Sequence, residues 1–248
     1  MTNSLSGKVA VVIGGSGGIG AAAARMLAAE GATVVVTWRS DEAAATTLLA
    51  GLPGQGHFAR RAVVEETATL TALAAEVATE LGRCDILVNS AGYTRPIPIA
   101  DLDALTDDCI DDMFKVNWRG QFAAIRAFAP LLKASGDGLI VSVSSIAGLS
   151  GVGSNLAYAA IKAGIDTMTK SLARALAPAV RVMSVSPGVV ATDFVPGRDA
   201  AALEKVALTI PLRRVATAED VGRAIAACAT HLTYSTGSLI VVDGGRAL

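Results

Sequence analysis

The chain has 248 residues, a hydrophobic content of 52% and a formal net charge of −1. Much of the hydrophobic content is alanine, and no run approaches the roughly 18–20 uninterrupted apolar residues that span a membrane, so no transmembrane segment or membrane partner is expected. The near-neutral charge, without a basic stripe, argues against nucleic acid as a partner.

Cysteine and histidine usage bears on cellular location and on metals. Cys84, Cys109 and Cys228 are odd in number and far apart, which is typical of reduced thiols in the cytoplasm. Residues 1–8 lack the apolar core of a signal peptide, so a cytoplasmic location is expected. His57 and His231 are isolated from one another and from the cysteines, and no metal site is predicted.

The N-terminal part of the chain alternates between apolar strands and alanine-rich helices. In chain order, the pattern predicts a strand at 8–13, a glycine-rich turn, a helix at 21–30, a strand at 33–37, a helix at 41–50, a strand at 56–63, a helix at 65–81 and a strand at 85–88. Gly82 is expected to end the third of these helices. Pro96 and Pro98 predict a loop at 94–100.

The C-terminal part continues the same alternation. It predicts a helix at 107–134, a strand at 139–143, a helix that carries Tyr158 and runs through Ala177, a strand at 180–185, a mobile segment to 211, a helix opened by Thr217 and a strand at 238–242. No linker or repeat interrupts the pattern. It therefore predicts one Rossmann-type α/β domain over residues 1–248, a doubly wound parallel sheet of about seven strands with helices on both faces.

Four glycine-rich or polar segments each follow a predicted strand: the glycine loop at 14–20, Asn89–Gly92, Ser145 and Pro187–Thr192. Ligands of such sheets bind beyond the carboxyl ends of the strands. The four segments are therefore expected to meet at one edge and to form one site.

The glycine loop, Gly14-x-x-x-Gly18-x-Gly20, lies between the first strand and the first helix. Glycine permits a tight turn and a close approach of the backbone to a pyrophosphate, and the start of a helix attracts phosphate. The motif in this position predicts nucleotide binding.

The end of the second strand selects between NAD and NADP. It lacks the carboxylate that would bind a ribose 2′-hydroxyl, and instead offers Arg39, with the hydroxyls of Thr37 and Ser40 beside it. A guanidinium can pair with a 2′-phosphate in a forked geometry. We expect NADP(H) as the preferred cofactor, with NAD(H) as the alternative and a solvated loop arginine as the competing interpretation.

Tyr158 and Lys162 are four residues apart in a predicted helix, which places phenol and ammonium on one face. A cation beside a tyrosine favours the phenolate and lowers the pKa of the phenol from its usual value of about 10. The pair suits general acid–base chemistry on a carbonyl or an alcohol.

These motifs together resemble the classical short-chain dehydrogenase/reductase family over essentially the whole chain, and most closely its 3-oxoacyl-[acyl-carrier-protein] reductase-type members. The glycine loop resembles the family's cofactor loop, Asn89-Ser-Ala-Gly92 its Asn-Asn-Ala-Gly element, and Pro187-Gly188-x-x-x-Thr192 its nicotinamide-contacting element. The ending, Thr236-Gly237 and Val242-Asp-Gly-Gly245, is also similar to that of the family.

The resemblance implies a catalytic set. Ser145 stands thirteen residues before Tyr158, at the position of the family's serine, and Asn117 falls where the family keeps an asparagine. In the family, the tyrosine donates a proton to the alkoxide that forms on hydride transfer, the serine hydrogen-bonds the same oxygen, the lysine lowers the tyrosine pKa and holds the nicotinamide ribose, and the asparagine positions a water. The catalytic residues are therefore expected to be Asn117, Ser145, Tyr158 and Lys162.

The cofactor-binding residues expected from the loop, the strand end and the resemblance are Gly14, Ser16, Gly18, Ile19, Gly20, Thr37, Arg39, Ser40, Val63, Asn89, Ala91, Gly92, Tyr158, Lys162, Pro187, Gly188, Val190 and Thr192. Three positions depart from the family's pattern. Ile13 replaces a threonine that braces the turn, Ser90 replaces an asparagine, and Ala62 replaces an aspartate that contacts adenine.

The resemblance implies an enzyme, an NADPH-dependent reductase of a ketone or 3-oxoacyl-type carbonyl. The alternatives are an alcohol, sugar or steroid-type dehydrogenase that works oxidatively, and a nucleotide-binding sensor that has lost catalysis. Substrate specificity is expected in residues 93–102, 148–156 and 190–211, whose apolar members favour a substrate without high charge. The apolar residues in these segments are Tyr93, Leu149, Val152, Leu156 and Phe194.

The expected partners are a small carbonyl or alcohol substrate and further copies of the chain. The resemblance implies a homotetramer or dimer, assembled through the helices near 107–134 and 155–177 and the last strand. Arg95, Arg119 and Arg126 are either contacts for an acidic carrier protein or ordinary solvated arginines.

Overall fold

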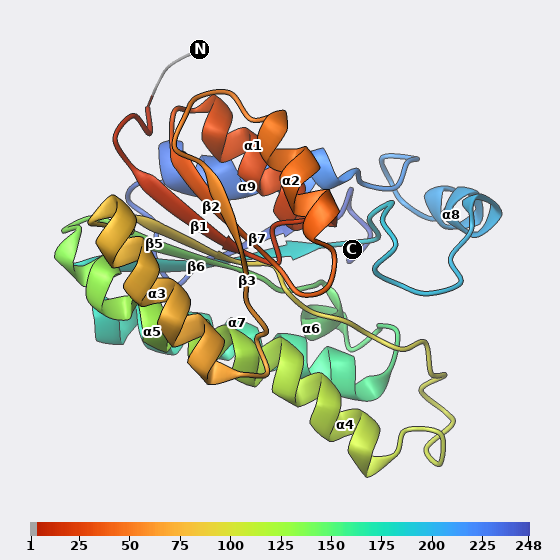
Figure 1. Ribbon diagram of the computed structural model, residues 1–248. Helices are drawn as coiled ribbons and strands as arrows, with labels where there is room; N and C mark the ends of the chain where they lie inside the picture. The colour runs from red at the N-terminus through yellow and green to blue at the C-terminus, as the bar shows by residue number, and fades with distance from the viewer. Residues whose placement is uncertain (1–3) are drawn as a thin grey trace.

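A computed structural model of the protein describes residues 4–248 and contains one parallel sheet with the strand order β3-β2-β1-β4-β5-β6-β7. Helices cover both faces of the sheet, as Figure 1 shows. The strands are β1 Val9–Ile13, β2 Thr33–Trp38, β3 Phe58–Arg61, β4 Ile86–Asn89, β5 Gly138–Val143, β6 Val180–Pro187 and β7 Leu239–Val242. This architecture confirms the predicted fold class.

The helices follow the predicted order with a few additions. They are α1 Gly18–Ala29, α2 Glu42–Ala50, α3 Thr67–Leu81, α4 Asp107–Phe114, a π-helical turn η1 Lys115–Arg119, α5 Gly120–Ala134, α6 Ala147–Ser150, α7 Leu156–Leu176, α8 Ala200–Ala207 and α9 Ala218–Thr230.

Alternation along the strands divides the core into two layers. In β1, Val9, Val11 and Ile13 belong to the apolar cluster beneath α3, α5 and α7, whereas Ala10 and Val12 belong to the cluster beneath α1, α2 and α9. Figure 1 shows these two groups of helices on opposite faces of the sheet. Both faces are buried, which explains why the strands are continuous apolar runs.

The abundance of alanine follows from how α1 and α9 pack. In α1, the residues from Gly20 to Ala24 are all buried. A Cβ on Gly222 of α9 would lie 2.9 Å from the backbone of Ala22, so the two helices approach as closely as their backbones allow. Small side chains at this contact raise the mean hydropathy of the chain without forming a membrane segment. Among residues 4–248, no helix is long and apolar enough to cross a membrane.

Three elements differ from the sequence prediction. The helix predicted at 107–134 is interrupted by η1, a wide turn of the kind that is often found at functional sites. The segment predicted to be mobile contains α8, whose first turn is capped by the Asp199 carboxylate accepting from the Ala202 N–H at 2.8 Å. No residue of α8 is buried, and the helix has only eight residues, which is shorter than the windows in which helical periodicity is recognised. The four-residue α6 was not predicted either.

A buried carboxylate joins the amino ends of β1 and β4. Asp85 is almost completely buried; it accepts from the Val9 N–H at 2.9 Å and from two nitrogens of Arg83 at 2.8 and 2.6 Å, and Lys8 lies 3.3 Å away. Burial raises the pKa of the Asp85 carboxyl, but Arg83, the Val9 N–H and Lys8 outweigh this effect and hold the pKa below its usual value. These contacts of Asp85 lie at the amino-terminal edge of the sheet, opposite to the predicted site.

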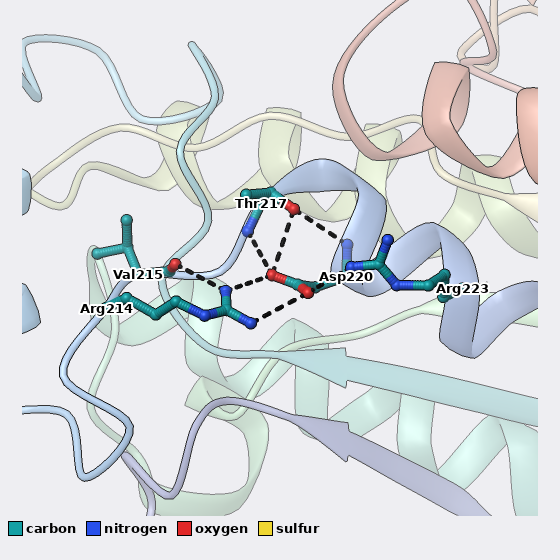
Figure 2. Close-up of polar contacts among 5 residues, drawn as sticks. All are labelled: Arg214, Val215, Thr217, Asp220 and Arg223. Atoms are coloured by element: carbon teal, nitrogen blue, oxygen red, sulfur yellow. Dashed lines mark hydrogen bonds and ion pairs between the residues drawn. The ribbon is translucent and has the colours of Figure 1, made fainter.

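The start of α9 is fixed by a capping box with two arginines attached to it. The Thr217 hydroxyl accepts from the Asp220 N–H at 3.2 Å, and the Asp220 carboxylate accepts from the Thr217 N–H at 2.9 Å, as drawn in Figure 2. Arg214 and Arg223 bind the two oxygens of the same carboxylate at 2.5 and 2.7 Å. Hydrogen bonds from Arg214 and from the Thr217 backbone hold the pKa of Asp220 well below its usual value.

Candidate active site

A single cavity of about 1420 Å³ occupies the carboxyl-terminal edge of the sheet. The four segments predicted to meet there all contribute to its walls, which confirms their convergence on one site. The predicted site residues that line it are Gly14, Ser16, Gly18, Ile19, Thr37, Arg39, Ala91, Gly92, Ser145, Tyr158, Lys162, Pro187, Gly188, Val190 and Thr192.

The glycine loop is shaped by backbone angles and close contacts that exclude a side chain. Gly14 and Gly18 have φ of +74° and +50°, in the left-handed region that favours glycine. A Cβ on Gly14 would lie 2.7 Å from the Ala91 nitrogen, and one on Gly20 would collide with the Gly14 carbonyl. Gly20 therefore packs within the loop and does not line the cavity.

Thr37 braces the glycine loop from the neighbouring strand. Its hydroxyl accepts from the Gly14 N–H at 2.9 Å, and its side chain is almost fully buried. Ile13 has no hydroxyl with which to brace the turn of the glycine loop, and the Thr37 hydroxyl supplies such a hydrogen bond instead. Thr37 also lines the cavity and its hydroxyl keeps a proton to donate, so its predicted contact with the cofactor stays a prediction.

Arg39 lies at the mouth of the cavity, beyond β2. Its Nη1 is 3.7 Å from Oε1 of Glu65, and 65% of its side chain is exposed, so this ion pair is weak. The guanidinium is therefore available to a ligand. Ser40, which was predicted beside it, is exposed and lies outside the cavity lining, whereas Trp38 and Glu65 are part of that lining.

Tyr158 and Lys162 lie on the first turns of α7, on the face turned toward the sheet. The Asn155 side chain caps the helix by accepting from the Tyr158 N–H at 2.7 Å. Tyr158 and Lys162 are 8% and 4% exposed, and the ammonium lies 5.5 Å from the centre of the phenol ring. Their shared face confirms the helical spacing that was read from the sequence.

The protonation of this pair differs from the sequence prediction. Burial raises the pKa of Tyr158 to about 12, against opposing contributions from the Ser145 hydroxyl and the Arg198 charge. Burial lowers the pKa of Lys162 to about 8, against the opposing charge of Asp166. Lys162 was expected to acidify the phenol, but its ammonium donates to the Val143 carbonyl at 2.8 Å and lies over the Tyr158 ring, 5.5 Å from the ring centre. Desolvation is the larger effect on both groups.

A buried polar layer lies behind Lys162. The Ser184 hydroxyl donates to the Asp166 carboxylate at 3.1 Å, and the Ser144 hydroxyl donates to the Lys162 carbonyl at 3.1 Å. Burial raises the pKa of Asp166, against opposing contributions from the nearby Ser144 and Ser184 hydroxyls and the charge of Lys162. Asp166, one turn after Lys162, is therefore the carboxylate that favours the charged state of the lysine.

Asn117 is fully buried in η1 and lies outside the cavity lining. Its Oδ1 accepts from the Tyr93 N–H at 3.0 Å, and its Nδ2 donates to the carbonyls of Tyr93 and Met113 at 2.9 Å each. The side chain therefore holds the loop after β4 against the π-helical turn. Its expected role in positioning a water stays a prediction.

Two other predicted contacts lie outside the cavity lining. Val63 makes backbone hydrogen bonds in both directions with the Thr69 hydroxyl, each 3.0 Å long. Asn89 is fully buried at the end of β4, and neither polar atom of its side-chain amide has a hydrogen-bond partner among residues 4–248. Ala62, where the family keeps an aspartate, does line the cavity, so that wall offers a methyl group in place of a carboxylate.

The substrate side of the cavity is partly as predicted. Tyr93, Val152 and Phe194 line it, and the ring of Phe194 lies 6.0 Å from that of Tyr158. Leu149 and Leu156 do not line it, and are about half exposed nearby.

Of the three arginines proposed for a carrier protein, none lines the cavity. The Arg119 side chain donates to the Glu65 carbonyl at 2.7 Å, and the Arg126 guanidinium lies 5.9 Å from the ring of Phe122. Sequence reasoning missed Arg198 and Arg246, which do line the cavity. Arg198 falls in the segment that was predicted to be mobile and Arg246 lies after the last strand, so no periodic pattern pointed to either.

Comparison with known proteins agrees with this geometry. Residues 14–247 match the family described as Enoyl-(Acyl carrier protein) reductase. The chain is 39% identical to the Granaticin polyketide synthase putative ketoacyl reductase 2 of Streptomyces violaceoruber, over 100% of this chain and 99% of the relative. It is 32% identical to the 3-oxoacyl-[acyl-carrier-protein] reductase FabG of Staphylococcus aureus, over 96% and 97% of the two chains.

A solved structure shares the fold closely. A putative short-chain dehydrogenase/reductase from Burkholderia xenovorans superposes with a TM-score of 0.89 at 34% identity, over 96% of this chain and 97% of that one. Fold, site and relatives together define an oxidoreductase with a nicotinamide-binding Rossmann fold. The chain belongs to the short-chain dehydrogenase/reductase family.

Proposed function

We propose that the protein is an NADPH-dependent reductase of a ketone or 3-oxoacyl-type carbonyl, which it converts to a secondary alcohol. The observation that carries the proposal is the shared cavity, whose walls include the glycine loop at one end and Tyr158 with Ser145 at the other. The names of the ketoacyl reductase relatives support the same substrate class.

The residues present fit a dinucleotide. The positive φ of Gly14 and Gly18 and the first turn of α1 form a cradle at the cavity wall, where the helix dipole favours phosphate. Arg39 supports NADP over NAD, since its exposed guanidinium can pair with a 2′-phosphate. Thr192 and Pro187, which also line the cavity, would hold the nicotinamide end. When bound, the cofactor supplies a hydride to the carbonyl carbon.

The protein's own part is to hold the carbonyl oxygen and to protonate it. With a pKa of about 12, the Tyr158 phenol carries its proton at neutral pH, which is the form a general acid needs. It would donate that proton to the oxygen as negative charge develops there, while the Ser145 hydroxyl hydrogen-bonds the same oxygen. In the reverse reaction the same phenol would have to accept the proton of the alcohol as a phenolate, so the oxidative rate should rise with pH.

Lys162 would keep a positive charge beside the reacting oxygen. Its ammonium is held by the Val143 carbonyl and favoured by Asp166, so the charge is fixed in place before a substrate enters. A preorganised charge in a water-poor site stabilises a developing oxyanion without reorganisation during the reaction.

We further propose a homo-oligomer in the cytoplasm. Support for assembly is a stack of aromatic rings on the outer surface of α4, η1 and α5: Phe114 and Trp118 are 5.2 Å apart, Trp118 and Phe122 are 5.8 Å apart, and Phe114 is 45% exposed. Light scattering tests the oligomeric state, and a monomer at micromolar concentration would contradict the proposed assembly. A cytoplasmic location is supported by the three unpaired, buried cysteines.

The test of the proposed function is the initial rate of NADPH and of NADH oxidation with β-ketoesters, simple ketones and acyl-thioester mimics. Tyr158→Phe is the matched variant, because it removes the acidic proton and keeps the ring. We expect turnover that prefers NADPH and falls by about 10²–10⁴-fold in the variant. Faster oxidation of alcohols with NADP+ than reduction of any ketone would favour an oxidative dehydrogenase, and no turnover with tight NADPH binding would favour a sensor.

A further inference from the structure

Two arginines from distant parts of the chain line the same cavity as Tyr158. Arg198 lies between β6 and α8, and Arg246 follows β7. Both line the cavity wall together with Tyr158 and Phe194, and both are half-buried. A partly buried guanidinium on a cavity wall is positioned to bind an anionic group of a ligand.

Neither arginine is paired with a carboxylate among residues 4–248. The side chain of Arg246 donates to the Thr209 hydroxyl at 2.8 Å, and that of Arg198 makes no hydrogen bond or ion pair with any residue that the structure describes. The acidic groups nearby are used elsewhere or are exposed: Asp199 caps α8, and Asp243 accepts from the backbone N–H groups after it. The carboxylate of Asp193 lines the cavity but lies within 4 Å of neither guanidinium.

The two guanidiniums act on each other and on the catalytic phenol. Burial and the charge of Arg246 both lower the pKa of Arg198, and the charge of Arg198 opposes the rise in the pKa of Tyr158. Like charges held together on a cavity wall repel each other unless an anion lies between them. By contrast with Arg198 and Arg246, three arginines elsewhere in the chain each bind a carboxylate: Arg83, Arg214 and Arg223.

We propose that Arg198 and Arg246 bind an oxyanion that is part of the carbonyl substrate. The substrate class is an oxo compound with a carboxylate or a phosphate at a distance from its ketone and an apolar segment between them. Tyr158 and Ser145 hold the ketone oxygen, and the apolar wall at Val152 and Phe194 contacts the segment. This proposal rests on the proposed function and assigns the substrate of the same site.

The experiment varies the charge of the substrate and compares two matched pairs of compounds. The first pair is a keto acid with a distal carboxylate and the amide of that acid. The second pair is acetoacetyl-coenzyme A and the uncharged S-acetoacetyl N-acetylcysteamine. For each pair, the quantity is the ratio of kcat/KM between the charged and the neutral compound, at saturating NADPH. The keto acid pair reports a carboxylate, and the thioester pair reports the phosphates of a pantetheine carrier.

We expect a ratio above tenfold in at least one pair, and a fall of that ratio by about tenfold in Arg198→Gln and in Arg246→Gln, because a charged hydrogen bond is lost. Arg198→Lys should retain part of the ratio, since it keeps the charge. The matched control is Arg174→Gln, an exposed arginine of α7 outside the cavity, whose ratio should equal that of the wild type. Circular dichroism and thermal unfolding establish that each variant is folded.

Equal kcat/KM for charged and neutral compounds, or a ratio that the two Gln variants leave unchanged, would overturn the proposal while leaving the reductase function intact. If no compound is turned over, the reductase function fails separately. The anion site is then judged by calorimetry with the keto acid at saturating NADP+. Binding that Arg198→Gln removes and Arg174→Gln keeps supports the site, and absence of binding to the wild type rejects it.

Discussion

The side chain of Asn117 pairs with the backbone of Tyr93 in both directions, accepting from its N–H at 3.0 Å and donating to its carbonyl at 2.9 Å. Two segments that are far apart in sequence, the loop after β4 and the turn η1, are joined in this way. The loop carries Gly92 and Tyr93 into the cavity wall, so Asn117 shapes the site from outside it.

Asn117→Ala should therefore weaken both the fold and the site. It leaves the partly buried N–H and carbonyl of Tyr93 and the buried carbonyl of Met113 without this partner, and each buried group left unsatisfied costs about 1–3 kcal/mol of the free energy of unfolding. Urea unfolding measures the loss, and KM for substrate should rise as the loop shifts. Gly92→Ala is the complementary variant, because its Cβ would collide with the Asn117 Oδ1. Wild-type stability in both variants would contradict this role.

As pH rises, the rate of ketone reduction should change with the deprotonation of Lys162 at a lower pH than with that of Tyr158. The pKa of Lys162 is lowered to about 8 and that of Tyr158 is raised to about 12. As pH rises through about 8, the lysine loses its charge while the phenol keeps its proton. We expect kcat for the ketone to fall over this range, and Asp166→Asn to move the fall to lower pH because it removes the charge that favours the ammonium. A kcat that is flat up to pH 10 would show that the charge of Lys162 is not needed.

Arg39→Gln should reduce the preference for NADPH. It removes the guanidinium proposed to bind the 2′-phosphate, so kcat/KM for NADPH should fall by about tenfold or more while that for NADH changes little. Arg60→Gln on the neighbouring strand β3, where Arg60 pairs with Glu76, is the matched control and should keep the preference. An unchanged ratio in Arg39→Gln would mean that Arg39 is an ordinary solvated arginine.

Acid should weaken the ion pairs that Asp85 forms with Arg83 and Lys8. Its pKa is depressed in the folded protein, so the carboxylate contributes stability that is present above its unfolded pKa of about 3.9 and is lost as pH falls through the lower folded value. At pH 7 we expect Asp85→Asn to lower the free energy of unfolding by about 1–3 kcal/mol, because the charged hydrogen bonds from Arg83 and Lys8 to a buried carboxylate are lost. The gap between variant and wild type should narrow below pH 4 in denaturant titrations, and a gap that is constant with pH would contradict the assignment.

The capping box of α9 should contribute to stability and to the site at once. Thr217→Ala removes the hydroxyl that accepts from the Asp220 N–H, at a cost of about 1 kcal/mol in the free energy of unfolding. Since Thr217 also lines the cavity, KM for the cofactor should rise as well. Thr230→Ala, at the other end of the same helix, is the control and should leave KM unchanged. If Thr217→Ala lowers the stability without changing the KM for the cofactor, the capping box has only a structural role.

The sequence predicts the fold well because the sheet depends on local signals. β-Branched runs mark the strands, glycines mark the ends of helices such as Gly82, which has a φ of +69° and ends α3, and four predicted segments do converge on one edge. The helical spacing of Tyr158 and Lys162 places both on one face without any further information.

What the sequence could not supply depends on three-dimensional surroundings. The pKa of Tyr158 was expected to be lowered and is raised, since the extent of its burial is not a property of its helix. The sequence did not show that the Thr37 hydroxyl accepts from the N–H of Gly14, a residue of another element. Arg198 and Arg246 line one cavity only because two segments that are distant in sequence fold over it.

The lack of any buried residue in α8 has a thermodynamic consequence. A helix that removes little apolar surface from water opens by local unfolding at low free energy, well below that of the whole domain. Its amides should exchange with deuterium early, and limited proteolysis should cut between β6 and α9 before it cuts anywhere in the sheet. A substrate anion that binds at Arg198 would then order this segment. Because the ordering offsets part of the binding free energy, the alcohol product is bound less tightly and is released quickly.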